Sequence, residues 1–348
     1  MNKNKILVTG GCGYIGSHTI IEILEQTDFE VISVDNLMNS TSDTLDRIER
    51  ITGKRVKNYT IDLCDLAKTE EIFKENPDLV GIIHFAALKS VPESVFKPLL
   101  YYHNNLNSLL NLLQLVEKYQ VNYFIFSSSC SVYGNVSKLP VNEQTPLSIA
   151  ESPYAYTKQI GEVMMKDFVR NNQVKAVALR YFNPVGAHVS GLNGENPINK
   201  PSNLVPVITQ TAAGIIPEMS VYGYDYDTRD GSCIRDYIHV TDIAEAHIKA
   251  MNYLIEGKNQ ANYEVYNLGT GNGVTVLEAI KAFEKVSGVK LNYKLAERRA
   301  GDVVAIYSDT TLSEQRLGWK TKLTIEDMMA SAWKWQQLLL KESMSNKK

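Results

Sequence analysis

Two residues with catalytic potential, Tyr154 and Lys158, lie four positions apart. Ser152 and Pro153 precede them and are typical of a helix start, so the spacing places both side chains on one face of a predicted helix. A phenol has an ordinary pKa of about 10, and a nearby ammonium favours its ionised form. The pair therefore predicts a tyrosine that acts as general acid and base, beside a lysine that makes the phenol more acidic.

A serine-rich segment offers further hydroxyl groups for the same chemistry. Its sequence is Ser127-Ser128-Ser129-Cys130-Ser131-Val132-Tyr133-Gly134, and it directly follows an apolar run. Ligands of parallel α/β sheets bind beyond the carboxyl ends of the strands. We therefore predict that a hydroxyl of this segment reaches the same substrate oxygen as Tyr154.

A glycine-rich turn, Thr9-Gly10-Gly11-Cys12-Gly13-Tyr14-Ile15-Gly16, lies between the first apolar run and a helix-like segment at residues 18–24. Gly10, Gly13 and Gly16 are predicted to provide a tight turn, a bare backbone that a pyrophosphate can approach, and close contact between helix and strand. The helix N-terminus adds N–H groups and partial positive charge. The segment therefore predicts a dinucleotide site, and tight helix packing is the structural alternative.

Two aspartates at predicted strand ends indicate which dinucleotide binds. Asp35 ends the second strand, nineteen residues after Gly16. A carboxylate there accepts hydrogen bonds from the adenosine ribose and repels a 2′-phosphate, which favours NAD over NADP. Asp62, near the end of the third strand, is placed to accept from the adenine amino group, although either aspartate could simply form a turn.

The predicted cofactor also bears on the acidity of Tyr154. With NAD bound, the positively charged nicotinamide ring and Lys158 are expected to bring the pKa of Tyr154 down to about 7, which requires roughly 4 kcal/mol.

Short apolar runs alternate with longer segments of helical period up to about Tyr181. Runs this apolar are typical of strands buried on both faces, and the segments between them are long enough for crossover helices. The pattern predicts an α/β fold built on a doubly wound parallel sheet of the Rossmann type. The predicted strands are residues 5–9, 30–34, 56–61, 79–85, 122–128 and 175–181.

After Tyr181 the chain becomes rich in proline, glycine and asparagine for about fifty residues. This predicts a smaller mixed α/β domain with many loops, placed to bind the substrate. We expect residues 1–182 to form the NAD-binding domain, residues 183–340 mainly the second domain, and residues 341–348 a polar, frayed tail. A helix at 241–255 and an apolar run at 264–268 are expected to return residues 236–268 to the first sheet. Further helices are predicted at 275–286 and 324–340.

The overall composition excludes several classes of protein. The chain has 348 residues, of which 44% are hydrophobic and 22% charged, and its net charge is −3, which argues against disorder and against nucleic-acid binding. The four cysteines, Cys12, Cys64, Cys130 and Cys233, lack metal-ligand spacing, so we expect neither a disulfide framework nor a metal site. No apolar segment suits a signal peptide or a membrane span, and we predict a cytoplasmic protein.

Seven ordered segments carry a resemblance to the extended short-chain dehydrogenase/reductase family, over nearly the whole chain. They are residues 10–16, 85–91, 127–134, 152–158, 181–188, 235–240 and 298–302. The resemblance is greatest to members that act on nucleotide sugars. It implies interconversion of UDP-glucose and UDP-galactose by inversion at C4, through a 4-keto intermediate and with tightly bound NAD, as a step of galactose metabolism. It also implies a homodimer that pairs the helices at 98–119 and 153–171.

The resemblance also implies site residues at matching positions. The implied catalytic residues are Tyr154, Lys158 and Ser129. Besides the three glycines, the implied cofactor contacts are Tyr14, Ile15, Asp35, Asn36, Asn39, Ser40, Asp62, Leu63, Phe85, Ala86, Lys89, Asn104, Tyr154, Lys158 and Phe182. The implied substrate contacts are Ser129, Tyr154, Asn183, Asn203, Leu204, Tyr222, Arg235, Arg299 and Asp302.

Other activities share much of this pattern. Nucleotide-sugar dehydratases and decarboxylases have the same glycines, tyrosine and lysine, but carry an acidic residue close to the serine, where this chain has Cys130 and Ser131. A protein that binds NAD without turnover is a third possibility. Ile306 aligns with a position where a smaller side chain admits a 2-acetamido group, so the resemblance also implies activity on UDP-GlcNAc and UDP-GalNAc.

Overall fold

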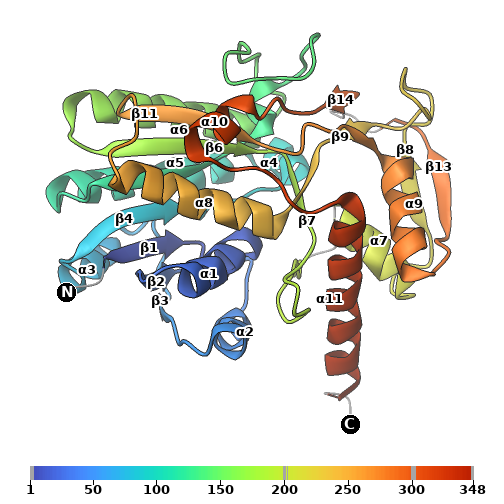
Figure 1. Cartoon of the computed structure of the whole chain (residues 1–348), viewed down its shortest axis with the longest axis horizontal. Coiled ribbons are helices and arrows are strands. Elements are labelled where there is room, and N and C mark those ends of the chain that lie inside the picture. The colour runs from blue at the N-terminus through green and yellow to red at the C-terminus, as the bar shows by residue number, and fades with distance from the viewer. Residues whose placement is uncertain (1–3, 199–200, 202, 299–302, 346–348) are drawn as a thin grey trace.

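Six strands from the first part of the chain and one later strand form a seven-stranded parallel sheet (Figure 1). The computed structural model describes residues 4–198, 201, 203–298 and 303–345. The strand order is β11-β6-β5-β4-β1-β2-β3, and every neighbouring pair is parallel. The strands are β1 (Lys5–Thr9), β2 (Glu30–Val34), β3 (Lys57–Tyr59), β4 (Leu79–His84), β5 (Tyr123–Ser129), β6 (Lys175–Tyr181) and β11 (Tyr263–Leu268). This confirms the predicted α/β fold with a doubly wound sheet.

Most strands match the predicted apolar runs, and the exception has a physical cause. β3 covers only three of the six predicted residues. It is an edge strand that pairs with β2 alone, and the chain turns away where the Ile61 N–H donates to the Tyr59 carbonyl. An edge strand forms backbone hydrogen bonds with one neighbour instead of two, so fewer hydrogen bonds keep its end residues in the strand conformation.

Helices cover both faces of the sheet and bury a separate apolar core on each. On one face lie α1 (Tyr14–Gln26), α2 (Asp43–Thr52) and α8 (Val240–Ile255). On the other lie α3 (Leu66–Glu75), α5 (Pro98–Lys118) and α6 (Pro153–Asn171). The short helices are α4 (Val91–Phe96), η1 (Cys130–Tyr133) and α10 (Thr311–Leu317). Figure 1 shows α8 and α1 side by side on the same face of the sheet. α8 packs on this face and β11 pairs with β6, so both elements lie with the sheet, as expected for the predicted helix at 241–255 and the apolar run at 264–268.

The second part of the chain has its own core beside the carboxyl ends of the strands. This core is formed mainly by α7 (Leu204–Ala212), α9 (Val276–Ser287), α11 (Ile325–Ser345) and β8 (Met219–Tyr222). β8 pairs with β13 (Tyr293–Ala296). The remaining strands are β7 (Asn183–Val185), β9 (Ile234–Arg235), β10 (Tyr237–His239), β12 (Val274–Thr275) and β14 (Ala305–Ile306). They form the β10-β7 pair and the β12-β9-β14 sheet, which link the two parts.

The predicted frayed tail is wrong for most of its length. α11 continues to Ser345 instead of ending at Leu340. Arg47 of α2 donates to both carboxylate oxygens of Glu342, at 3.2 and 2.6 Å, and its guanidinium also lies over the Trp335 ring. This contact between distant segments holds a polar helix end that the local sequence alone would leave loose. Within the described ranges, no helix combines the length and the apolar character that crossing a membrane requires.

Candidate active site

The first turns of α6 present Tyr154 and Lys158 on one helix face. The Ser152 side chain accepts a hydrogen bond from the Ala155 N–H, and Pro153 occupies the first turn, so the predicted start signals operate as expected. Lys158 is buried, whereas Tyr156, two residues after Tyr154, is half exposed. The helix therefore aims the catalytic pair at the end of β5.

The end of β5 binds both members of this pair. The Ser129 hydroxyl lies beside the Tyr154 phenol and acts to lower its pKa. Ser129 Oγ also accepts the Ser131 N–H at 3.2 Å, which leaves its own proton for the phenol oxygen. The Lys158 ammonium donates to the Ser127 carbonyl at 2.7 Å and lies 6.0 Å from the centre of the Tyr154 ring. The predicted catalytic residues thus come together in space.

Burial governs the pKa values of both members of the pair in the chain without a cofactor. Burial raises the pKa of Tyr154 to about 12, although the neighbouring Ser129 hydroxyl opposes this rise. Burial also lowers the pKa of Lys158 to about 8, against the charge of Glu162, which raises it. In the chain without a cofactor, loss of hydration therefore keeps the Tyr154 phenol protonated. The predicted lower pKa, which needs the positive ring of bound NAD as well as Lys158, stays a prediction.

The glycine turn is close-packed in a way that requires glycine at two positions. Gly10 has a φ of 68°, and a Cβ there would lie 2.9 Å from the Ala86 nitrogen. A Cβ on Gly16 would lie 2.2 Å from the Gly10 carbonyl oxygen. Gly13 precedes α1 as its N-cap and provides no side-chain cap. The first N–H groups of α1 therefore meet bare backbone, which a diphosphate can approach.

Asp35 lies directly after β2 and faces this turn. One carboxylate oxygen accepts the Cys12 N–H at 3.0 Å, and the other accepts from the Leu37 N–H and the Ser40 hydroxyl at 2.9 and 2.8 Å. Asp35 therefore forms a turn and, at the same time, holds a fixed negative charge beside the glycines. The turn, the free helix end and this carboxylate fit a dinucleotide with an unmodified ribose.

The sequence matches known proteins along nearly its whole length. Residues 7–332 match the family model described as GDP-mannose 4,6 dehydratase. Over 332 residues, the chain is 46% identical to the UDP-glucose 4-epimerase of Bacillus subtilis (strain 168), and the match covers 95% of this chain and 96% of that protein. The chain belongs to the UDP-glucose 4-epimerase family. This confirms the resemblance on which the site residues were predicted.

Solved structures of the UDP-glucose 4-epimerase family share the fold. A UDP-glucose 4-epimerase from Bifidobacterium longum, in complex with NAD+ and UDP, is 48% identical with a TM-score of 0.91, covering 96% of this chain and 98% of that one. A UDP-Glc/GlcNAc 4-epimerase from Campylobacter jejuni is 37% identical with a TM-score of 0.82, covering 96% and 99%. Similarity at this level supports comparison of site residues as well as of fold.

In this member of the epimerase family, several predicted cofactor residues form hydrogen bonds with neighbouring residues of the chain. Tyr14 donates to the Gly186 carbonyl at 2.6 Å, and the Asp62 carboxylate accepts the Cys64 N–H at 2.9 Å. The Asn104 side chain donates to Asn105 at 2.9 Å. The remaining predicted residues lie on the loops that follow β2, β3, β4 and β6 or at the start of α1, namely Ile15, Asn36, Asn39, Leu63, Phe85, Ala86 and Phe182.

The predicted substrate residues are only partly within the described structure. Asn183 Oδ1 is buried without a hydrogen-bond partner among the described residues, so it can accept from a ligand. Asn203 precedes α7, which begins at Leu204 and thus presents a helix N-terminus as predicted. Arg235 donates to the carbonyls of Ile234 and Val303 at 2.9 and 2.6 Å. Tyr222 ends β8, half exposed. Arg299 and Asp302 lie outside the described residues.

Two acidic residues at the site were missed by the sequence analysis. Glu195 pairs with Lys89 at 3.0 Å and accepts from Asn203 at 2.8 Å, so it joins a predicted cofactor residue to a predicted substrate residue. Its loop carries no sequence signal for this position. Glu162, four residues after Lys158, could have been found, because the helical spacing continues the face that Tyr154 and Lys158 define.

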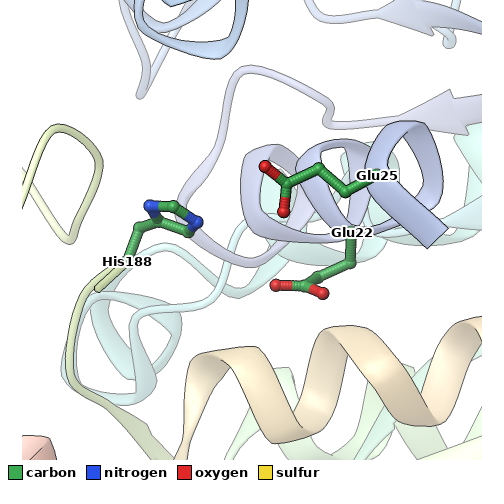
Figure 2. Close-up of side chains that lie close together, drawn as sticks. All are labelled: Glu22, Glu25 and His188. Carbon is green, nitrogen blue, oxygen red and sulfur yellow. The ribbon is translucent and has the colours of Figure 1, made fainter. Parts of the chain in front are cut away.

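The fold also gathers three potential metal ligands that the sequence did not predict. Ligand atoms of Glu22, Glu25 and His188 all lie within 4.8 Å of one another (Figure 2). They come from α1 and from the loop after β7, apart from the catalytic residues. Glu22 binds Gln26, and His188 binds Ser190 at 2.8 Å. These local hydrogen bonds account for much of the group's arrangement.

Proposed function

We propose that this chain interconverts UDP-glucose and UDP-galactose by inverting C4 of the sugar, with NAD bound throughout. The observation that carries the proposal is the convergence of Tyr154, Ser129 and Lys158 at the strand ends, next to a glycine turn that fits a dinucleotide. Bound NAD would accept a hydride from C4 and return it to the opposite face. The predicted cofactor and substrate contacts, including Arg299 and Asp302, form part of the proposal.

The chain's own residues would supply the proton chemistry. Tyr154 takes the proton of the sugar 4-hydroxyl and later returns it, while Ser129 donates to the same oxygen centre. Since burial alone keeps the phenol protonated, the lower pKa that this step needs depends on the positive charge that arrives with the cofactor, together with Lys158. Inversion then requires the 4-keto sugar to turn and present its other face. The diphosphate remains anchored near Asn203 and Arg235 during that turn.

An assay without added cofactor tests the function directly. The purified protein is incubated with UDP-galactose alone, and UDP-glucose is measured. We expect conversion, together with NAD released from the protein after denaturation, because the cofactor is regenerated in each cycle. Bound NAD with no conversion would indicate a binding protein instead, and no conversion even with added NAD would refute the proposal.

Dehydration of the sugar is the main alternative, since the matching family model is described by a dehydratase. Removing water needs a proton donor and acceptor in addition to the tyrosine. Beside Ser129 stand Cys130 and Ser131, and burial raises the pKa of the Cys130 thiol to about 12, which leaves it protonated and inert near neutral pH. The same assay, read by mass spectrometry, should show no product that has lost water.

The range of sugars is a finer part of the proposal, and it rests on Ile306. This side chain is buried against Val132 and Phe182, at the wall behind the serine segment. Replacing Ile306 with Tyr should fill the space for a 2-acetamido group, so activity on UDP-GalNAc is expected to fall about tenfold or more while activity on UDP-galactose persists. Ile306→Leu, which keeps the volume, is the control and should retain both. Equal acetamido activity in the Tyr variant would contradict the assignment.

We also propose that the chain forms a homodimer through α5 and α6. α5 and α6 pack together, and their outer faces expose Leu99 (79%) and Val163 (58%), with Phe96 at the end of α4 (84%). Exposed apolar residues gathered on adjacent helices are typical of an interface. We expect the wild type to be a dimer by light scattering, and the double variant Leu99→Glu, Val163→Glu to be a monomer, because paired carboxylates would be buried. Leu295→Glu on β13 is the control. A wild-type monomer would contradict the proposal.

A further inference from the structure

The end of β5 and one face of α6 are tied together by three successive contacts. Along α6, Tyr154, Lys158 and Glu162 are spaced one turn apart. Tyr154 lies beside the Ser129 hydroxyl, the Lys158 ammonium donates to the Ser127 carbonyl at 2.7 Å, and Glu162 accepts from the Ser128 hydroxyl at 2.5 Å. Hydrogen bonds from two successive turns of α6 thus reach Ser127 and Ser128, and Tyr154 and Lys158 share their helix face with a buried carboxylate.

Glu162 is held in turn by a buried arginine on the next strand. Arg180 of β6 donates to both carboxylate oxygens, at 2.8 and 2.5 Å, and the two side chains are 6% and 7% exposed. Arg180 also donates to the Tyr133 hydroxyl at 3.0 Å, and Tyr133 donates to Asn267 of β11 at 2.6 Å. The carboxylate is therefore fixed to β5, β6 and β11 by a network whose charges are paired.

Stability alone gives little reason for such a pair. Removing two charges from water costs several kcal/mol, and a well-packed apolar pair often serves a core equally well. Unlike an apolar pair, however, a buried carboxylate acts electrostatically on the charged groups near it. Here that effect acts on the Lys158 ammonium, one helical turn away, whose charge the carboxylate favours.

We propose that Glu162, held by Arg180, is a positioning residue for the reaction proposed above. It fixes the position of α6 relative to the end of β5 and provides the negative charge that faces the Lys158 ammonium. The inference rests on the proposed function, because the lysine charge matters only if Tyr154 ionises during the reaction. Glu162 acts through Lys158 and does not itself need to touch the substrate.

The other titratable groups around Lys158 leave Glu162 as the main source of negative charge. His84 of β4 lies near the ammonium, and burial lowers its pKa to about 3, so it is neutral in the working range. Tyr154 of α6 and Tyr181 of β6 are both buried phenols with raised pKa values. Arg180 of β6 is already paired with Glu162. Removing the carboxylate charge therefore lowers the pKa of Lys158 further.

The test compares pH profiles of UDP-galactose conversion by Glu162→Gln and by the wild type. The Lys158 ammonium should lose its proton at lower pH in the variant, so the alkaline limb of kcat should move down by about one pH unit. At the wild-type optimum kcat should fall about 10- to 100-fold, with KM little changed, because the reacting groups are displaced but the UDP contacts are not. Asp167→Asn, an exposed charge removal on the same helix, should leave the profile unchanged.

A double variant guards against misfolding, since Glu162→Gln leaves the Arg180 guanidinium buried and unpaired. Glu162→Gln with Arg180→Met removes both charges and should fold, and its alkaline limb should also move to lower pH. A fall in kcat with an unmoved limb in both variants would overturn the inference and indicate a structural role. Wild-type kcat in both variants would overturn it as well. Absence of conversion by the wild type would refute the proposed function and this inference together, a result distinct from an unmoved limb.

Discussion

Replacing Tyr154 with Phe is expected to lower kcat for UDP-galactose by about three orders of magnitude. The change removes one oxygen atom, the only part of the side chain that can take the proton of the sugar hydroxyl. The ring and its packing remain, and Ser129 and Lys158 keep their backbone positions. NAD content measured after denaturation should therefore stay near the wild-type value, so that the loss lies in the chemical step.

Tyr156→Phe is the matched control for this change. Tyr156 lies on the same helix two residues further on, is half exposed and points away from the serine segment. It should retain wild-type kcat. If Tyr154→Phe kept a substantial fraction of wild-type activity, proton transfer would have to be carried by another group, and the assignment of the catalytic residue would be wrong.

Replacing Gly16 with Ala is expected to remove the bound cofactor and, with it, activity in the absence of added NAD. The new Cβ would lie 2.2 Å from the Gly10 carbonyl oxygen, a distance at which backbone atoms must move. Because this turn is packed between β1 and α1, the shift would alter the cradle for the diphosphate. Overpacking of this kind costs about 1–3 kcal/mol of stability, so the melting temperature should also fall.

Gly257→Ala separates cofactor loss from general destabilisation. Gly257 has a positive φ of 65° after α8, and nothing lies within 4 Å of a Cβ placed there. Its replacement should cost some stability through backbone strain while NAD content stays at the wild-type level. Normal NAD content in the Gly16→Ala variant would contradict the role given to the glycine turn.

Much of this molecule could be predicted from local sequence. β1, β2 and β6 coincide with the predicted apolar runs, since a strand buried on both faces must be apolar throughout. The start of α6 followed from Ser152 and Pro153, and the spacing of Tyr154 and Lys158 fixed their common face. These features depend on short-range chemistry, such as capping, periodicity and the steric freedom of glycine.

Other features depended on segments far apart in the chain. The length of α11 is decided partly by Arg47, which binds Glu342 from another helix. Glu195 reaches both Lys89 and Asn203, and the Glu22, Glu25 and His188 group assembles only through folding. Such contacts leave no pattern in sequence because their partners are separated by many residues and nothing local constrains the pairing.

The sequence by itself determined the sheet, the glycine turn and the common helix face of Tyr154 and Lys158, because each of these depends on residue type and spacing. Only the tertiary structure decided the charge state around that pair. Burial raises the pKa of Tyr154 and lowers that of Lys158, and the buried Glu162 partly opposes the second change. Hydration depends on every neighbour that displaces water, and those neighbours come from β5, β6 and α6 together. The direction of the two pKa shifts could therefore not be predicted from the local sequence.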